Sequence, residues 1–108
     1  MVFSERLKKN DDFRTVYREG RSAADQNLVV YLRKNHTDGN RLGISVSKKT
    51  GNSVMRHLFK RRIREIYRSR ETEMPHGRDI VVIARAGAPD RSYGELLTSF
   101  DRLIRRLS

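Results

Sequence analysis

Two segments of alternating hydrophobicity, residues 27–33 and 41–47, constrain the fold of this chain most strongly. An apolar residue at every second position is typical of a strand with one buried face. The intervening stretch "NHTDGN" contains Asp-Gly, a common hairpin turn sequence. The pattern therefore predicts that the two strands form a hairpin and are antiparallel neighbours.

The two faces of these strands differ in chemistry. One is fully aliphatic and is expected to face the core: Leu28, Val30, Leu32, Leu42, Ile44 and Val46. The other is small, hydroxylated and partly aromatic: Val29, Tyr31, Arg33, Gly43, Ser45 and Ser47. An antiparallel sheet commonly leaves one face to solvent. From the residues alone, the second face is equally well an ordinary solvated surface or a binding platform.

Three helices and one further strand complete the expected order of helix, strands, helix, strand, helix. The first helix is "NDDFRTVYREG", capped by Asn10 or Asp11 and ended by Gly20. A long helix is capped by Asn52 or Ser53. A last helix begins at Asp90 or Ser92, after Pro89. "RDIVVIAR" reads as a buried strand. A chain of 108 residues has room for one core, so residues 1–108 are expected to form a single domain.

The net charge narrows the class of partner. Lys and Arg number 24 against 13 Asp and Glu, giving a net charge of +11, which indicates a polyanion and first of all nucleic acid. No apolar run is long enough to span a membrane, so no membrane partner is expected. With no cysteine and no apolar signal segment at the start, a cytoplasmic location is expected.

The long helix after residue 52 carries its cations on one side. Between residues 48 and 70 the only acid is Glu65, and the cations Arg56, Lys60 and Arg64 repeat at spacing four, where like charges repel. Bound phosphates would relieve this repulsion, so the pattern favours a phosphate-binding helix over a merely solvated face. Lys48, Lys49 and Asn52 precede it and add donors near the helix N-terminus.

No catalytic or metal-binding set is apparent. His36, His57 and His76 lack metal-ligand spacing, and no nucleophile and base can be paired. Asp11 and Asp12 lie where a helix start favours acids. No catalytic residue and no metal ligand is therefore predicted.

The segments "RLKKNDDFRTVYREG", "RLGISVSKKTGNSVMR", "FKRRIRE" and "DIVVIAR" resemble, in order, those of the protein subunit of bacterial ribonuclease P. The resemblance covers nearly the whole chain. It implies an α/β (α+β) two-layer sandwich of αβββαβα order, with a four-stranded mixed sheet and a left-handed βαβ crossover, against the usual handedness.

The resemblance also implies a division of labour. A large RNA subunit using Mg²⁺ removes the 5′ leader from precursor tRNA, while the protein binds that RNA and the single-stranded leader. Binding of the RNA subunit would fall on Lys48, Lys49, Asn52, Arg56, His57, Lys60, Arg61, Arg62, Arg64 and Arg68. Binding of the leader would fall on Phe13, Tyr17, Val29, Tyr31, Ser45 and Ser47. Weak self-association is left open.

One departure from the family pattern lies in the basic helix. Where the family reads Arg-Asn-Arg, this chain has Arg56-His57-Leu58, and Arg62 replaces an aliphatic residue one turn after Leu58. A helical side chain leans toward the N-terminus, so Arg62 could restore the lost charge near Leu58. The competing interpretation is that Arg62 only extends out of the apolar half of the helix without contacting RNA.

Two other functions fit the composition. One is a stand-alone RNA-binding or ribosome-associated module without a role in processing. The other is a DNA-binding protein that places the basic helix in a major groove, although the helix has neither a preceding helix-turn pattern nor a dimerisation seam.

Overall fold

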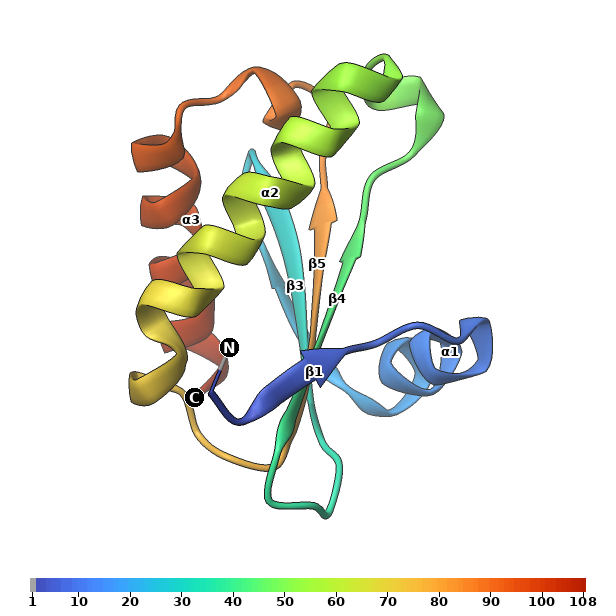
Figure 1. Cartoon of the computed structure of the whole chain (residues 1–108), viewed down its shortest axis with the longest axis vertical. Helices are drawn as coiled ribbons and strands as arrows, with labels where there is room; N and C mark the ends of the chain where they lie inside the picture. Colours follow the sequence, from blue (N-terminus) through green and yellow to red (C-terminus); the bar gives the residue numbers. More distant parts are fainter. Residues whose placement is uncertain (1) are drawn as a thin grey trace.

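The computed structural model describes residues 2–108 and contains one mixed sheet with three helices (Figure 1). The strands are β1 (Ser4–Arg6), β2 (Arg21–Ala24), β3 (Leu28–Lys34), β4 (Asn40–Ser45) and β5 (Arg78–Ala84). The helices are α1 (Asn10–Glu19), α2 (Ser53–Arg70) and α3 (Tyr93–Leu107), with short 3-10 turns at Lys48–Thr50, Glu71–Glu73 and Ala88–Asp90. The expected mixed α/β fold class is confirmed.

The sheet has five strands in the order β1-β4-β5-β3-β2, one strand more than the four expected. The additional strand is β1, which pairs parallel to β4 at one edge and aligns Arg6 with Leu42. No alternation marks β1 in the sequence, because it is three residues long and polar. It forms because its backbone adds to an edge that is already in place.

The predicted hairpin between residues 27–33 and 41–47 is wrong. β5 lies between β3 and β4, antiparallel to β3 and parallel to β4. The reason is the apolar content of β5, whose Ile80, Val81 and Val82 are all fully buried. Such a strand is most stable at the centre of a sheet with a partner on each side, so the Asp-Gly segment becomes a wider loop instead of a tight turn.

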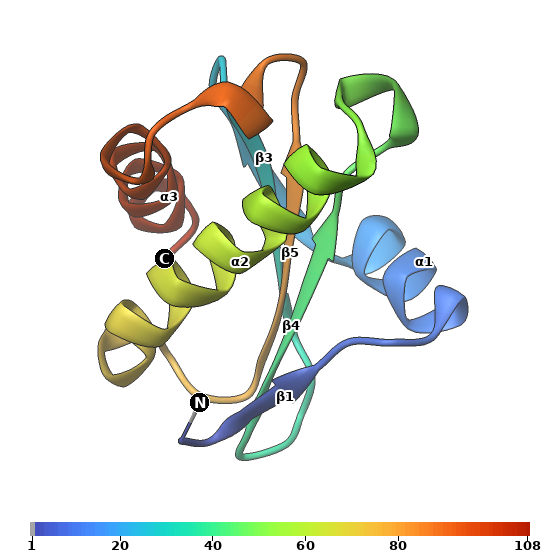
Figure 2. The same cartoon turned by 45° about the horizontal axis from the view of Figure 1, so that its top comes forward.

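The expected left-handed crossover joins β4 to β5 through α2. In Figures 1 and 2 both strands point upward, α2 runs in front of them, and β5 lies to the left of β4. A right-handed connection would place the second strand to the right. The crossover places α2 diagonally across the sheet, and the N-terminal end of α2 lies above the end of β4.

The aliphatic face of the sheet forms the main core, as predicted. Leu28, Val30 and Leu42 are buried there against α2 and α3. The helices contribute the buried side chains of Phe59, Ile63, Ile66, Tyr67, Leu96, Phe100, Leu103 and Leu107. The ring of Tyr67 is fully buried, while its hydroxyl bonds to Ser4 and Asn40.

The opposite face of the sheet is covered at one end by α1 (Figure 2). There Leu7, Val16 and Val81 form a second, smaller buried cluster, with Phe13 and Tyr31 packed against it. The rest of this face remains accessible. The second face is thus neither fully solvated nor fully covered.

Two of the three predicted helix caps are confirmed. Asn52 Oδ1 accepts from the N–H of Met55 at 2.9 Å, and Ser92 Oγ accepts from the N–H of Glu95 at 3.1 Å. The predicted cap of α1 at Asn10 or Asp11 is wrong, because the helix begins one residue earlier, after Lys9, which makes no side-chain cap bond. The acids of the first turn still favour the helix dipole.

Both ends of α1 are tied to the sheet through the buried Asp79. Arg41 donates to both carboxylate oxygens of Asp79, at 2.8 and 2.7 Å, and also pairs with Asp12 at 3.3 Å. Arg33 pairs with Asp79 at 3.2 Å and with Glu19 at 3.0 Å. These bonds fix the position of α1 over the sheet.

Candidate RNA interface

The exposed side of α2 carries the cations that the sequence placed there. His57, Arg61 and Arg68 are exposed, and Arg56, Lys60 and Arg64 are partly exposed. Glu65 neutralises only one of them, through an ion pair of 3.3 Å with Arg61. Most of the helix charge therefore has no acidic partner within residues 2–108.

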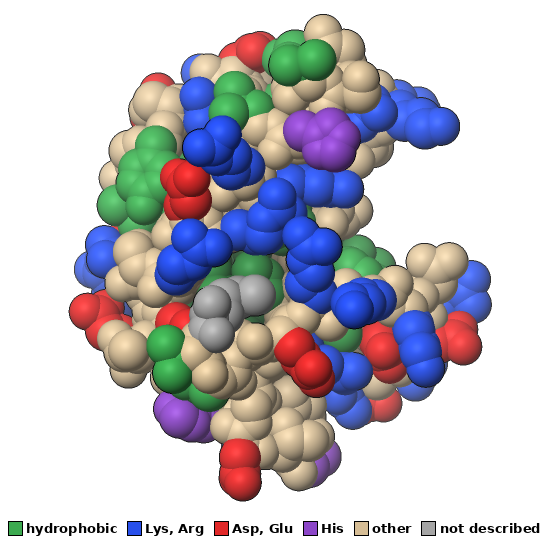
Figure 3. All heavy atoms as spheres, viewed as in Figure 1, with side chains coloured by type: hydrophobic (Ala, Val, Ile, Leu, Met, Phe, Trp, Pro, Cys, Tyr) green, Lys and Arg blue, Asp and Glu red, His purple; other side chains and the backbone are tan. Residues whose placement is uncertain are grey.

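A basic cleft lies between α2 and β1. Its volume is about 500 Å³ and it is lined by Arg6, Leu7, Lys8, Leu42, Ile44, His57, Lys60 and Arg64, without a carboxylate. Figure 3 shows Lys and Arg side chains gathered over α2 and at the hollow between its start and α1. Sequence reasoning missed Arg6 and Lys8, because only the β1–β4 pairing brings them opposite α2.

Electrostatics in this cleft favour an anion. Burial lowers the pKa of Arg64, and the neighbouring charges of Arg6 and Arg68 lower it further. Arg64 is thus repelled by two neighbouring guanidinium groups while it is partly withdrawn from solvent. A phosphate bound there would replace the repulsion with attraction.

The N-terminal segment is anchored by the end of α2 and the turn after it. Glu71 is buried, and its carboxylate accepts from the backbone N–H groups of Val2 (2.6 Å) and Phe3 (3.1 Å). Ser4 bonds to the hydroxyl of Tyr67 at 2.6 Å, and the ring of Phe3 stacks on His76 at 3.9 Å. This anchoring positions Arg6 of β1 and Lys8 just after it.

The loop before α2 has structural roles as well as charge. Lys48 and Lys49 are exposed in the 3-10 turn. The side-chain oxygen of Asn52 is engaged in the helix cap, and Arg56 Nη1 donates to the carbonyl of Gly51 at 2.9 Å. The loop is therefore held rigidly against the first turn of α2.

Arg62 has a partner inside the protein. Its Nη1 donates to the carbonyl oxygen of Arg91 at 2.7 Å, which links α2 to the segment before α3. Leu58, one turn earlier, is 39% exposed. This contact supplies a structural reason for an arginine at position 62, and the exchange of roles with position 58 stays a prediction.

An aromatic cleft lies on the other side of β4, between α1 and the sheet. Its volume is about 320 Å³, and it is lined by Asn10, Phe13, Arg14, Tyr17, Ile44 and Ser45. The rings of Phe13 and Tyr17 are 6.3 Å apart, and those of Tyr17 and Tyr31 meet edge to face at 5.1 Å. Burial raises the pKa of the Tyr17 hydroxyl.

The aromatic cleft unites only part of the predicted leader-binding set. Phe13, Tyr17 and Ser45 line it, and Tyr31 touches the Tyr17 ring. Val29 lies farther along the sheet, beside Ile83 and Ala24, and Ser47 is exposed beyond the end of β4. Asn10 and Arg14 were missed; Asn10 precedes Phe13, and Arg14 precedes Tyr17, by three residues on one helix, a spacing that could have indicated them.

The two clefts adjoin each other. Ile44 lines both, so the end of β4 separates the basic cleft from the aromatic cleft.

Within residues 2–108, no group of three or more His, Asp or Glu side chains is placed to hold a metal ion. In the same range no helix has the length and apolar character needed to cross a lipid bilayer.

These features define a small mixed α/β protein with an acid-free basic cleft, the surface chemistry of a polyanion-binding protein. The family model "Ribonuclease P" matches residues 1–108. The chain belongs to the ribonuclease P protein family.

Relatives in this family agree in sequence and in fold. The ribonuclease P protein component of Lachnoclostridium phytofermentans is 47% identical over 94% of this chain and 88% of its own length. That of Alkaliphilus metalliredigens is 43% identical over 99% and 96%. The solved RNase P protein of Staphylococcus aureus is 41% identical, with a TM-score of 0.86, and the match covers 94% of this chain and 93% of that one. The solved RNase P protein of Thermotoga maritima is 34% identical, also with a TM-score of 0.86, and the match covers 95% of this chain and 97% of that one.

Proposed function

We propose that this chain assists an RNA catalyst in removing the 5′ leader from precursor tRNA, by binding the RNA subunit in the basic cleft and the leader in the aromatic cleft. The observation that carries the proposal is the junction of the two clefts at Ile44. One protein could then hold the catalyst and the substrate strand side by side. The location proposed for this activity is the cytoplasm.

The basic cleft suits the folded RNA subunit. Its cations come from α2 and from the anchored N-terminal segment, Arg6 on β1 and Lys8 just after it, so the fold fixes their arrangement relative to the phosphate backbone. Fixed donors lose little conformational freedom on binding. The family relatives are named as protein components of ribonuclease P, which supports an RNA subunit as the partner.

The aromatic cleft suits a single-stranded leader. Ring faces stack on any base, so they bind strands of varied sequence. Ser45, Asn10 and Arg14 add hydrogen-bond donors beside the rings. A duplex has no unstacked bases to offer to such a cleft, which favours the unpaired leader over the body of the tRNA.

The proposed reaction places no chemistry on the protein. The three histidines lie in separate parts of the chain, at a loop, on α2 and after the second 3-10 turn. Mg²⁺ would be bound by the RNA subunit, where it would supply charge stabilisation and an activated water. The protein side chains would bind and orient the two RNAs.

Reconstitution tests this proposal. The purified chain is mixed with a bacterial ribonuclease P RNA and a precursor tRNA at low Mg²⁺, and cleavage is followed in a single turnover. We expect correct 5′ cleavage well above that of the RNA alone. A stand-alone RNA-binding module, or a DNA-binding protein, would leave the rate at the level of the RNA alone and so contradict the proposal.

A second arm omits the RNA subunit. The protein with precursor tRNA and Mg²⁺ should cleave nothing. Cleavage that survives repurification, and that follows the protein through a denaturing and refolding step, would exclude RNA as the only catalyst.

A further inference from the structure

Four arginines from distant segments converge at the β2 edge of the sheet, far from α2. Arg21 begins β2, Arg85 follows β5, and Arg102 and Arg106 lie one turn apart on α3. All four are exposed. We call them the β2-edge arginines.

Each of these arginines is held by one hydrogen bond to the fold. The Nη1 groups donate as follows: Arg85 to the carbonyl of Asp25 (3.0 Å), Arg102 to Asp25 Oδ2 (3.2 Å), Arg106 to the carbonyl of Ala24 (3.5 Å) and Arg21 to the carbonyl of Leu107 (3.2 Å). A guanidinium has five N–H donors, so each retains donors for a ligand. The anchoring bond limits the freedom that binding would cost.

The charge of this surface is poorly neutralised. Asp25 is the carboxylate in contact with it, and its side chain is only 6% exposed. That carboxylate also accepts from the N–H groups of Asn27 (2.8 Å) and Leu28 (3.0 Å), so it serves the turn between β2 and β3. A backbone carbonyl can orient a guanidinium but does not cancel its charge.

The arginine between α2 and α3 differs from the β2-edge arginines in its partner. Arg70 of α2 pairs with Asp101 of α3 through two bonds, at 2.9 and 3.0 Å. Arg102 and Arg106, in contrast, are like charges at spacing four, where they repel each other in the absence of a ligand. Arg70, between the helices, thus has a carboxylate as its partner, whereas at the edge only Arg102 meets a carboxylate, that of the buried Asp25.

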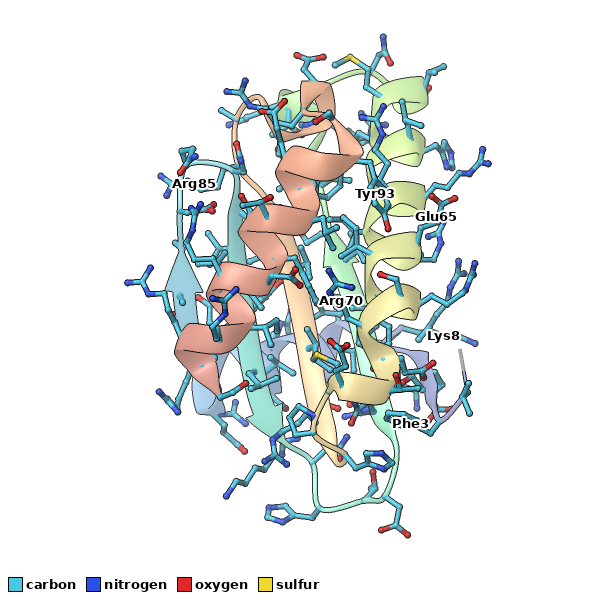
Figure 4. The ribbon with its side chains drawn as sticks, turned by 90° about the vertical axis from the view of Figure 1, so that its left-hand side faces the viewer. Phe3, Lys8, Glu65, Arg70, Arg85 and Tyr93 are labelled. Carbon is cyan, nitrogen blue, oxygen red and sulfur yellow. The ribbon has the colours of Figure 1, made fainter. Side chains whose placement is uncertain are left out.

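The β2-edge arginines lie at the opposite edge of the sheet from the basic cleft. β1 and β2 are the two outer strands. Figure 4 shows Arg85 on one side of the helical layer, beyond the strand ends, with Lys8 and Glu65 on the other. Beside Arg21 lies a cavity of about 580 Å³ whose lining holds the cations Arg21, Arg33, Lys34 and Arg78 and one acid, Glu19, which pairs with Arg33.

We propose that the β2-edge arginines form a second RNA-binding surface, which takes the phosphodiester backbone of a second RNA segment. A guanidinium matches a phosphate with two parallel hydrogen bonds. The cluster has no large apolar residue of the kind that anchors protein interfaces, so a phosphate backbone fits it better than an acidic protein. The inference takes only the identity of the polyanion, RNA, from the proposed function.

A pair of matched variants tests the surface. Arg102→Gln with Arg106→Gln removes two charges from it. The control, Arg18→Gln with Arg105→Gln, removes two exposed charges elsewhere: Arg18 lies on α1, and Arg105 lines the cavity beside Arg70 and Met74. Chemical denaturation of both confirms that they are folded. Affinity is measured as a function of salt, separately for ribonuclease P RNA and for precursor tRNA.

We expect the test variant to reduce the slope of log affinity against log salt by about 1.4 to 1.8, since each lost phosphate contact contributes about 0.7 to 0.9. The RNA whose slope falls identifies the source of the segment. Arg102→Lys with Arg106→Lys should retain most of the slope, because it keeps the charge. A test variant that matches the control with both RNAs overturns the inference.

The outcome is separable from that of the proposed function. Lys60→Gln with Arg64→Gln, in the basic cleft, is measured in parallel. Should this variant bind like the unmodified protein while the β2-edge variant weakens, the assignment of the basic cleft fails and the second surface stands. Should only the cleft variant weaken, the proposed function stands and the second surface is refuted.

Discussion

The ring of Phe13 lies against the backbone of Gly43. A Cβ at position 43 would approach two ring carbons of Phe13 to 2.7 Å and Leu7 Cδ2 to 3.1 Å. The absence of a side chain on β4 therefore lets α1 approach the sheet and sets one wall of the aromatic cleft. This glycine is needed for space and not for an unusual backbone angle.

Gly43→Ala should displace the Phe13 ring and weaken binding of leader-bearing precursor tRNA. We expect a loss of stability of about 1 to 3 kcal/mol from overpacking. Denaturation and binding to precursor and mature tRNA measure the two effects. Gly94→Ala is the control, since the nearest atom to its added Cβ is 4.0 Å away. Normal leader binding by the Gly43 variant would show that the Phe13 position is unimportant.

Removing single rings should reveal stacking in the aromatic cleft. Phe13→Ala, Tyr17→Ala and Tyr31→Ala are each expected to weaken precursor binding by about 1 to 3 kcal/mol if a base stacks on the ring. With mature tRNA, which lacks the leader, the loss should vanish. Tyr93→Ala, at an exposed site on α3, is the matched control. Equal losses with both substrates would refute the cleft assignment.

The strand β1 should contribute to RNA binding as much as α2 does. Arg6→Gln and Arg64→Gln are each expected to lower the salt slope for ribonuclease P RNA by about 0.7 to 0.9, the value of one phosphate contact. Lys9→Gln, just outside the cleft lining, provides the comparison. An unchanged slope for Arg6→Gln would confine the site to the helix.

Arg62→Leu should cost stability, because the guanidinium bonds to the carbonyl of Arg91. The expected loss is about 1 kcal/mol, typical of one net hydrogen bond. A double-mutant cycle with Leu58→Arg, followed by denaturation and RNA binding, separates the two roles. If Arg62→Leu weakens RNA binding and Leu58→Arg restores it, the arginine has taken over the function of position 58.

Asp79 should make stability depend on pH in the acid range. Burial alone would raise its pKa, but hydrogen bonds from Arg41 and Asn35, with the charges of Arg41 and Arg33, hold the pKa below its ordinary value. A carboxyl of this kind stabilises the fold fully above its unfolded pKa, about 3.9, and loses that contribution as the pH falls through the lower folded value.

Asp79→Asn should therefore destabilise the protein at pH 7 by about 3 to 5 kcal/mol, since it leaves Arg41 and Arg33 without their buried partner. Its unfolding free energy should also vary less than that of the unmodified protein below about pH 4. Asp38→Asn, in an exposed loop, should change neither quantity. A steep acid loss retained in Asp79→Asn would assign the effect to other carboxyls.

Local sequence patterns predicted the helices and most of the strands, but not which strands are neighbours in the sheet. The alternation at Leu28–Leu32 identified the core face of its strand correctly, because it depends on residues close in sequence. Strand order depends on competition between distant segments. The insertion of β5 between β3 and β4 followed from its burial on both faces, which a short apolar run does not reveal by itself.

In the candidate site, too, features that depend on residues close in sequence could be predicted, and those that depend on distant segments could not. The cations of α2 could be placed on one face from helical spacing alone. Arg6 and Lys8 join them only through the pairing of β1, a strand too short and polar to predict. Gly43 could be assigned to a strand, but its contact with Phe13 depends on where α1 docks.

The central position of β5 also orders the steps of folding during synthesis. β3 and β4 share no hydrogen bonds, so the sheet stays open until residues 78–84 have left the ribosome. The apolar side of α2 has no completed surface to cover until then, because α2 is synthesised before β5. Nascent chains shorter than about 84 residues should therefore expose apolar surface next to the cationic residues of α2. In such chains, early binding of RNA would compete with aggregation.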